Sequence, residues 1–133
     1  MTPADTVDVP VRVAPLRIIV AEDNEDLRAA VVALIDAEPD LECVGDAAEV
    51  ETIATLVRSL RPDVVLLDFE LRGQSCLPLL ADVKSQPVAC IIFSGHAHPR
   101  MAELSIAAGA RDFIVKSGNF DEVLASIRRH GRM

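Results

Sequence analysis

Acidic side chains follow short apolar runs at two places in the sequence. Glu22 and Asp23 come after the run at residues 16–21, and Asp68 comes after the run at residues 64–67. Carboxylates that are brought together repel one another, and a hard divalent cation with oxygen ligands, such as Mg²⁺, relieves that repulsion and can bridge to phosphoryl oxygens. Asp68 could then act as a nucleophile toward phosphorus. An aspartate that ends a strand can also simply begin a turn, so the rest of the sequence must decide between these interpretations.

The elements around these residues alternate between strands and helices. Five apolar runs have the length and composition of buried strands, at residues 16–21, 41–44, 63–68, 88–93 and 112–115. Each is followed by a segment with apolar residues at helical spacing. Asn24 is a good N-cap for the first helix, Gly45 should follow the second strand, a loop through Gly73 should precede the third helix, and Gly109 should end the fourth in the left-handed conformation. The predicted apolar helix positions are Leu27, Val31, Leu34 and Ile35; Val50, Ile53, Val57 and Leu60; Leu77, Leu80 and Val83; Met101, Leu104 and Ala108; and Phe120, Val123, Leu124 and Ile127.

This alternation predicts an α/β fold with a doubly wound parallel sheet, helices on both faces and right-handed crossovers. We expect the strand order 2-1-3-4-5, in which the first, third, fourth and fifth strands are neighbours. Ligands in open parallel sheets bind beyond the carboxyl ends of the strands. The polar residues just past these ends should therefore meet at one edge of the sheet: Glu22, Asp23, Asp68, Ser94 and Lys116.

The composition limits the classes of function. A net charge of -8 without a basic run argues against direct nucleic-acid binding, because phosphate contacts need clustered Lys or Arg. No segment is apolar and long enough to span a membrane and residues 1–15 do not resemble a signal peptide, so we expect a cytoplasmic protein without membrane contact. Cys43, Cys76 and Cys90 lack metal-site spacing, as in reduced, buried thiols. We expect a flexible tail at residues 1–15, one domain at 16–130 and a short C-terminal end at 131–133.

Four short motifs resemble the signature of response-regulator receiver domains, over residues 16–130. They are Ile19-Val20-Ala21-Glu22-Asp23-Asn24, Val65-Leu66-Leu67-Asp68, Ile92-Phe93-Ser94-Gly95 and Phe113-Ile114-Val115-Lys116. An acidic pair, a lone aspartate, a hydroxyl and a lysine in this order, each closing a strand, form a specific pattern. The resemblance implies the flavodoxin-like fold of CheY and its relatives. It also implies that Asp68 accepts a phosphoryl group from a sensor histidine kinase or a histidine phosphotransfer protein.

The same resemblance implies a metal site around the acceptor. Asp23 and Asp68 would bind Mg²⁺ directly together with the backbone carbonyl of Glu70, while Glu22 would act mostly through water. Glu70 and His96 also lie at the positions that tune water access, and therefore dephosphorylation, in the family.

The remaining site residues would bind the phosphoryl group and transmit its presence. The resemblance places Ser94, Gly95 and Lys116 on the phosphoryl oxygens. Ser94 and Phe113 are the implied switch residues, because Phe113 would turn inward after Ser94 moves toward the phosphoryl group. The surface that changes would present a binding face to a downstream protein or to a second copy of the chain. It comprises the helix near residues 101–108, the strand at 112–115 and the helix near 120–127.

The sequence departs from the family pattern in two loops. Arg72 precedes Gly73 where Pro-Gly is common, and Cys76 stands where another glycine is common, so we expect a loop that is more mobile than usual. Ser117 stands where a cis proline often follows the lysine, and a non-proline cis bond costs about 3–4 kcal/mol, so we expect a trans bond and a shifted loop. Lys116-Ser117-Gly118 is more similar to receivers that precede a helix-turn-helix domain. No such domain is in the sequence, so we expect a single-domain regulator.

Two other classes of function stay open. A phosphatase of the haloacid dehalogenase type also uses an aspartyl nucleophile and Mg²⁺, but its second aspartate would fall at Glu70 and its cap domain is missing from the sequence. A degenerate receiver would bind partners without being phosphorylated, although the acidic pair, the acceptor, the hydroxyl and the lysine are all intact. We expect a phosphorylation-controlled switch, shuttle or phosphate sink. It would not be an enzyme beyond catalysing its own phosphorylation and dephosphorylation.

Overall fold

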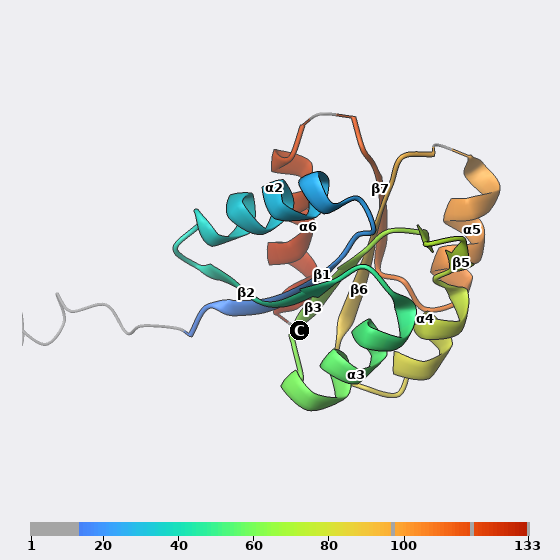
Figure 1. Ribbon diagram of the computed structural model, residues 1–133, viewed down its shortest axis with the longest axis horizontal. Coiled ribbons are helices and arrows are strands. Elements are labelled where there is room, and N and C mark those ends of the chain that lie inside the picture. The colour runs from blue at the N-terminus through green and yellow to red at the C-terminus, as the bar shows by residue number, and fades with distance from the viewer. Residues whose placement is uncertain (1–13, 97, 118, 133) are drawn as a thin grey trace, which may run out of the picture.

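The computed structural model describes residues 14–96, 98–117 and 119–132. Its centre is a five-stranded parallel sheet in the order β2-β1-β3-β6-β7 (Figure 1). The strands are β1 (Leu16–Ala21), β2 (Leu41–Ala47), β3 (Val64–Leu67), β6 (Ala89–Ser94) and β7 (Asp112–Val115). Because β6 and β7 are the fourth and fifth strands of this sheet in chain order, the predicted order 2-1-3-4-5 is confirmed.

Helices cover both faces of the sheet (Figure 1). One face is packed by α2 (Glu25–Asp36) and α6 (Asp121–Gly131). The other face is packed by α3 (Val50–Leu60), α4 (Leu77–Val83) and α5 (Pro99–Ala107). The arrangement is the predicted doubly wound α/β fold.

The central strands are aliphatic because both of their faces are buried. All four residues of β3 are at most 2% exposed. Alternate residues of a strand point to opposite faces. Val64 and Leu66 belong to the core beneath α2 and α6, whereas Val65 and Leu67 belong to the core beneath α3 and α4. Packing from both sides therefore fixes β3 and brings Asp68, the next residue, to the carboxyl edge of the sheet.

Local signals set the ends of several helices. The Asn24 Oδ1 accepts a hydrogen bond of 2.9 Å from the Leu27 N–H, so Asn24 is the predicted N-cap of α2. Arg61 follows α3 in the left-handed region, with a φ of 48°, and Pro62 comes next. Gly109 has the predicted left-handed conformation after α5, with a φ of 116°. At Arg61 and Gly109 the chain has left the helix and turns toward the following strand.

Three details correct the sequence-based predictions. β2 continues through Gly45 to Ala47, and Gly45 suits this place because a Cβ there would lie 3.2 Å from the Leu60 side chain of α3. Leu34 and Leu104 were predicted on apolar faces, but they are 46% and 40% exposed. Val31 and Ile35 are one turn apart and form the buried stripe of α2. On α5 the buried position is Ser105, whose hydroxyl donates to the Met101 carbonyl.

The loop after β3 contains a hairpin that was not predicted. Its strands are β4 (Glu70–Leu71) and β5 (Gln74–Ser75), which pair in antiparallel fashion. The turn between them consists of Arg72 and Gly73. The second loop that departs from the family pattern has the predicted trans bond after Lys116, since the described residues contain no cis peptide bond.

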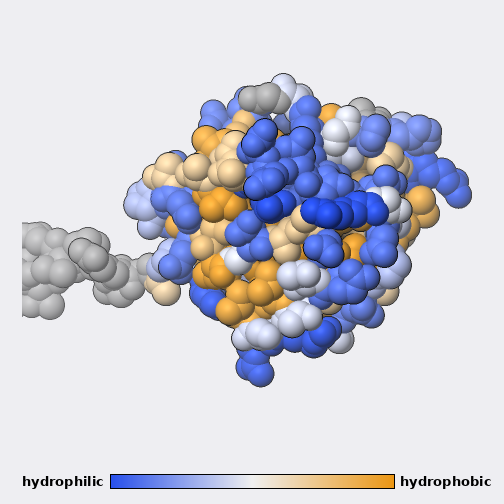
Figure 2. All heavy atoms as spheres, in the orientation of Figure 1, coloured by the Kyte–Doolittle hydropathy of each residue, from blue (hydrophilic) through white to orange (hydrophobic). Residues whose placement is uncertain are grey.

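Hydrophilic residues cover much of the face drawn in Figure 2, with apolar patches between them. The three cysteines are free; Cys76 and Cys90 are buried as predicted, and Cys43 is half-buried. Burial raises the pKa of the Cys90 thiol to about 12, so this thiol is protonated at neutral pH. None of the helices in the described ranges is long and apolar enough to cross a membrane. The predicted tail at residues 1–15 lies outside the described residues except for its last two positions, as does Met133 of the predicted C-terminal end.

Candidate functional site

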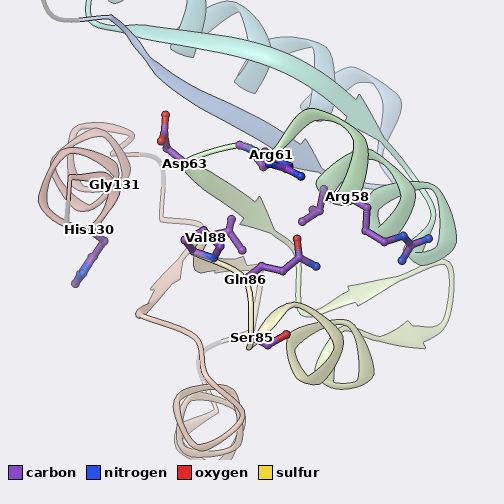
Figure 3. A pocket seen from close by; sticks show the side chains of 11 residues that line it. Arg58, Arg61, Asp63, Ser85, Gln86, Val88, His130 and Gly131 are labelled. Carbon is purple, nitrogen blue, oxygen red and sulfur yellow. The ribbon is translucent and has the colours of Figure 1, made fainter.

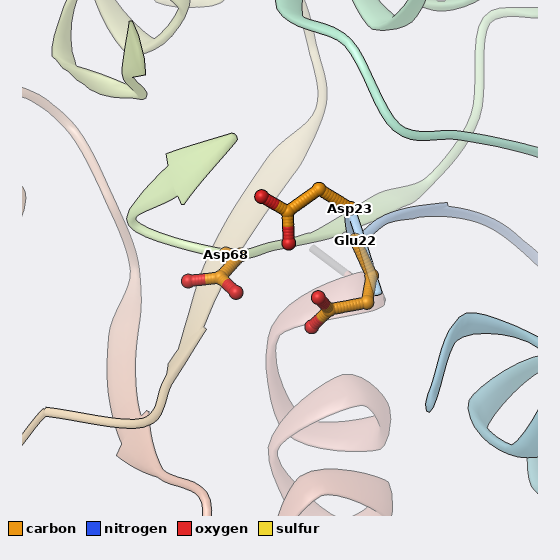
Figure 4. Close-up of side chains that lie close together, drawn as sticks. All are labelled: Glu22, Asp23 and Asp68. Atoms are coloured by element: carbon orange, nitrogen blue, oxygen red, sulfur yellow. The ribbon is translucent and has the colours of Figure 1, made fainter. Parts of the chain in front are cut away.

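Three carboxylates meet at the carboxyl edge of the sheet. Glu22 and Asp23 follow β1, Asp68 follows β3, and these two strands are neighbours. One oxygen from each of the three side chains lies within 4.8 Å of the other two, and Figure 4 shows the carboxyl groups turned toward a common space. The predicted acidic cluster is thus present. Its three oxygen donors fit a hard divalent cation such as Mg²⁺ in chemical type and spacing.

Glu22 is the most enclosed of the three, with an exposed fraction of 4%. Its Oε2 accepts a hydrogen bond of 3.0 Å from the Asn24 N–H, and its Oε1 accepts one from the Lys116 ammonium. Burial raises the pKa of Glu22, and the bonds from Lys116 and Asn24 offset this only in part. The side chain is therefore fixed beneath the other two carboxylates.

Lys116 follows β7 and joins two of the carboxylates. Its Nζ donates to Glu22 Oε1 at 2.5 Å and to Asp68 Oδ2 at 2.8 Å. Burial alone would lower the pKa of Lys116, but the two carboxylates outweigh it and raise the pKa above its ordinary value. The lysine is therefore charged at neutral pH. It binds two of the three carboxylates, Glu22 and Asp68.

Phe93 lies beside this lysine and Phe120 packs on Phe93; these contacts were not predicted from the sequence. The Lys116 Nζ lies 5.6 Å from the centre of the Phe93 ring, within range of a cation–π interaction. Phe93 packs edge-to-face on Phe120, with ring centres 6.0 Å apart. Phe93 precedes Ser94, the hydroxyl residue of its motif, and its aromatic side chain is the signal in the sequence for this contact.

Asp23 is held by the backbone of the hairpin. The Arg72 N–H donates a hydrogen bond of 2.9 Å to Asp23 Oδ2. This bond is the main reason why the pKa of Asp23 lies below its ordinary value. The contact joins residues 49 positions apart through a main-chain donor, which no pattern of side chains in the sequence reveals.

The other predicted site residues lie at or near the ends of β3, β6 and β7. Ser94 is fully buried at the end of β6, and its Oγ accepts a hydrogen bond of 3.2 Å from the His96 N–H. Gly95 and His96 are exposed. Glu70 is exposed at the start of the hairpin, and its N–H lies 3.5 Å from Asp68 Oδ1. Phe113 is half-buried in β7 and packs against the core beneath α3 and α4.

The fold and the site together define an α/β domain with a carboxylate cluster and a lysine at the carboxyl edge of its parallel sheet. Residues 18–128 match the response regulator receiver domain, and the chain belongs to this family of two-component signalling proteins. The family resemblance seen in the sequence is confirmed.

Relatives of known sequence support the same assignment. The chain is 29% identical over 116 residues to the uncharacterized transcriptional regulatory protein YvfU of Bacillus subtilis, covering 86% of this chain and 58% of YvfU. It is 28% identical over 113 residues to the transcriptional regulatory protein DesR of the same organism, covering 85% and 57%. The chain thus spans little more than half the length of these two relatives.

Solved structures have the same fold. A DNA-binding response regulator of the LuxR family from Staphylococcus aureus superimposes with a TM-score of 0.82 at 27% identity, covering 88% of this chain and 99% of that one. The receiver domain of the putative response regulator NarL from Mycobacterium tuberculosis has a TM-score of 0.85 at 24% identity, covering 90% and 98%. The predicted fold class is confirmed.

Proposed function

We propose that Asp68 accepts a phosphoryl group from a phosphorylated histidine, on a sensor kinase or a phosphotransfer protein, in a Mg²⁺-dependent step. The observation that supports this most is the position of Asp68. It lies beyond the end of a strand that is packed on both faces, with Lys116 on one oxygen and with Glu22 and Asp23 beside it. Phosphoryl transfer depends mainly on positioning and charge stabilisation, and this arrangement supplies both.

The two oxygens of Asp68 have different partners. Oδ2 accepts the 2.8 Å bond from Lys116, whereas Oδ1 has, among the described residues, only the long 3.5 Å contact from the Glu70 N–H. Oδ1 is therefore the freer oxygen and the proposed nucleophile. Its attack forms an O–P bond while the P–N bond to the donor imidazole breaks, and the electron pair of that bond returns to the ring nitrogen. No general base is required because the carboxylate attacks as an anion.

The surrounding residues would stabilise the charge on the transferred group. Bound Mg²⁺ would supply charge neutralisation at the phosphoryl oxygens, with Asp23, Asp68 and the Glu70 carbonyl as direct ligands and Glu22 acting through water. Lys116 would bind another phosphoryl oxygen, and Ser94 and Gly95 would donate hydrogen bonds to the rest. In this scheme Glu70 and His96, both exposed beside the acceptor, control how water reaches the acyl phosphate.

The phosphorylated chain would signal by binding a protein. In this proposal Ser94 moves toward the phosphoryl group, and the Phe113 side chain turns into the space that this leaves beside β6. Phe113 lies on β7, opposite Ile92 of β6 in the strand register. The surface formed by α5, β7 and α6 then changes. Leu104 and Ile106 of α5 are 40% and 49% exposed, so this surface offers apolar side chains to a downstream protein or to a second copy of the chain.

The three free cysteines of the chain fit a reducing compartment such as the cytoplasm.

Acetyl phosphate with Mg²⁺ tests the acceptor assignment. Intact-mass spectrometry should show one added phosphoryl group, which hydroxylamine should remove because an acyl phosphate is labile to it. Asp68→Asn should prevent the addition, and Asp82→Asn, on the exposed surface of α4, should not. An adduct that persists in Asp68→Asn, or that resists hydroxylamine, contradicts the assignment.

Beryllofluoride, a phosphoryl mimic, tests the signalling surface. Ring signals of Phe113 in NMR spectra, together with light scattering, should change as the site is saturated. If the acceptor is occupied while Phe113 and the α5-β7-α6 surface stay unchanged, the chain acts as a phosphate sink and does not signal through this surface.

A further inference from the structure

The hairpin after Asp68 has a defined turn. Glu70 pairs with Ser75 and Leu71 pairs with Gln74, which leaves a two-residue connection. Arg72 and Gly73 in this connection both have positive φ angles, 50° and 79°. Left-handed conformations at both central positions are typical of a type I′ turn, the tight turn that matches the twist of a hairpin.

The hairpin is anchored in the hydrophobic core. Leu71 is 1% exposed and Cys76, directly after β5, is fully buried. The Cys76 N–H donates a hydrogen bond of 2.7 Å to the Phe69 carbonyl, which closes the base of the loop. The turn is therefore carried by residues that are fixed on the same side of the sheet as α3 and α4.

The turn offers one main-chain donor to the acidic cluster. In a two-residue hairpin, the N–H of the first turn residue is not used by the strand ladder. Here that N–H belongs to Arg72 and lies 2.9 Å from Asp23 Oδ2. A carboxylate has two oxygens, so the hydrogen bond from the hairpin to Oδ2 does not occupy Oδ1, which can bind a cation.

We propose that the hairpin at residues 70–75 is a positioning element for the metal site, in which the Arg72 N–H orients the Asp23 carboxylate toward the cation. The inference rests on the Mg²⁺ site of the proposed function. Hydrogen bonds to a ligating carboxylate fix its orientation and keep it available to the metal. The position requires an N–H group and a residue that can occupy the left-handed region, so the main chain of residue 72 does the positioning and its guanidinium does not.

A matched pair of substitutions separates the turn from its side chains. Apart from Gly73 and its two chain neighbours, no atom of the described residues lies within 4 Å of the place where a Cβ would stand on Gly73, so the main effect of a substitution there is on the backbone conformation. Valine strongly disfavours a positive φ, whereas asparagine tolerates it. Gly73→Val should raise the dissociation constant for Mg²⁺ about tenfold, and Gly73→Asn should leave it close to that of the unchanged chain.

Two substitutions at the donor residue complete the set. Arg72→Pro removes the N–H and should weaken Mg²⁺ binding at least as much as Gly73→Val. Arg72→Asn keeps the N–H and favours the turn, so it should retain Mg²⁺ binding although the guanidinium is lost. Loss of binding in Arg72→Asn equal to that in Arg72→Pro would assign the effect to the side chain and overturn the proposal.

Amide hydrogen exchange gives a readout independent of phosphorylation. If the hydrogen bond supports metal binding, then Mg²⁺ must in turn strengthen the hydrogen bond, because coupling between two sites is reciprocal. The Arg72 amide should exchange more slowly when Mg²⁺ is added. Faster exchange, or tighter Mg²⁺ binding in Gly73→Val, would show that the hairpin competes with the cation and would overturn the proposal.

The same titrations distinguish this inference from the proposed function. If the unchanged chain binds Mg²⁺ and Gly73→Val binds it equally well, only the positioning role fails. If the unchanged chain does not bind Mg²⁺ at millimolar concentrations, the metal site fails and the positioning role fails with it. Thermal unfolding of each variant checks that the fold itself is retained.

Discussion

The partners of charged side chains differ between the two ends of the sheet. At the carboxyl end, three carboxylates lie together, and the Lys116 ammonium binds two of them, Glu22 and Asp68. At the amino end several charged side chains have hydrogen-bonding partners. The Asp63 Oδ2 accepts from the Arg17 N–H at 2.8 Å, and the guanidinium of Arg17 donates to the last carbonyls of the α3 segment, those of Leu60 and Arg61. Arg128 of α6 binds Glu38 and Asp40 together.

The amino end also contains a hollow of about 660 Å³ between the ends of α3 and α6 and the loop before β6 (Figure 3). Arg58, Arg61 and Asp63 line it together with His130 and the apolar Val88. The charges at its rim have both signs. At the carboxyl end, by contrast, three carboxylates lie together and Lys116 forms ion pairs with two of them. We infer that the charged residues at the carboxyl end serve the chemistry of the site, whereas those at the amino end stabilise the fold.

The largest expected contrast comes from aspartates at opposite ends. Asp68→Asn should abolish phosphoryl acceptance while leaving the free energy of unfolding unchanged or raising it by up to about 1 kcal/mol in the absence of Mg²⁺. The reason is that one repelling charge is removed while Lys116 keeps Glu22 as a partner. Urea unfolding measures the change. A loss of stability would mean that Asp68 contributes more to the fold than to the site.

A glycine at the amino end should show the opposite behaviour. A Cβ on Gly131 would lie 3.0 Å from side-chain atoms of Leu16 and Val64, which is tighter than ordinary contact, so these side chains would have to move by a few tenths of an ångström. Gly131→Val should lower the free energy of unfolding by about 1–3 kcal/mol through overpacking. Phosphorylation by acetyl phosphate should continue at temperatures where the variant is folded. Failure of the folded variant to accept a phosphoryl group would show that the two ends are coupled.

A smaller loss is expected when the hydrogen bond between β1 and the start of β3 is removed. Asp63→Ala deprives the Arg17 N–H of its acceptor, and an unmade hydrogen bond in a partly buried place costs about 1 kcal/mol. Thermal or urea unfolding should show this loss, while the Mg²⁺ affinity stays the same. A change in Mg²⁺ affinity would contradict the separation of the two ends.

The smallest effect concerns the exposed ion pair between Arg128 of α6 and Asp40, which precedes β2. The hydrogen bonds from Arg128 are the main reason why the pKa of Asp40 lies below its ordinary value of 3.8. The pair therefore stabilises the fold above that value, and this contribution is lost as the pH falls through the lowered pKa of the folded state. In Arg128→Ala the pKa of Asp40, followed by NMR, should return toward 3.8, and the unfolding transition should become less sensitive to pH below 4. An unchanged pKa would show that the ion pair is not formed in solution.

The sequence contained most of the information that places Asp68. Strands that are buried on both faces have continuous aliphatic sequences. The aliphatic runs before Glu22 and Asp68 therefore predicted where these two strands end. Alternation with helices then fixed the order of the strands, and the order brought the acidic residues to one edge. These signals are local or periodic, and the structure agrees with them.

Contacts that depend on the backbone or on distant residues could not be predicted. The donor on Asp23 is the main-chain N–H of Arg72, which exists in every residue except proline and so carries no signal in the sequence. Arg128 pairs with residues about ninety positions earlier, and nothing near it in the chain indicates this. Leu34 and Leu104 fit an apolar periodicity yet are exposed. The buried positions are Val31 and Ile35 on α2 and Ser105 on α5.

Borohydride trapping after phosphorylation tests the central claim most directly. Borohydride reduces an aspartyl acyl phosphate to homoserine and leaves ordinary carboxylates unchanged, so peptide mass spectrometry locates the acceptor. After treatment with acetyl phosphate and Mg²⁺, homoserine should be found at position 68 and should be absent from Asp68→Asn. Reduction at Glu22 or Asp23, or no reduction in a chain that carries the added mass, would contradict the assignment of Asp68 as the phosphoryl acceptor.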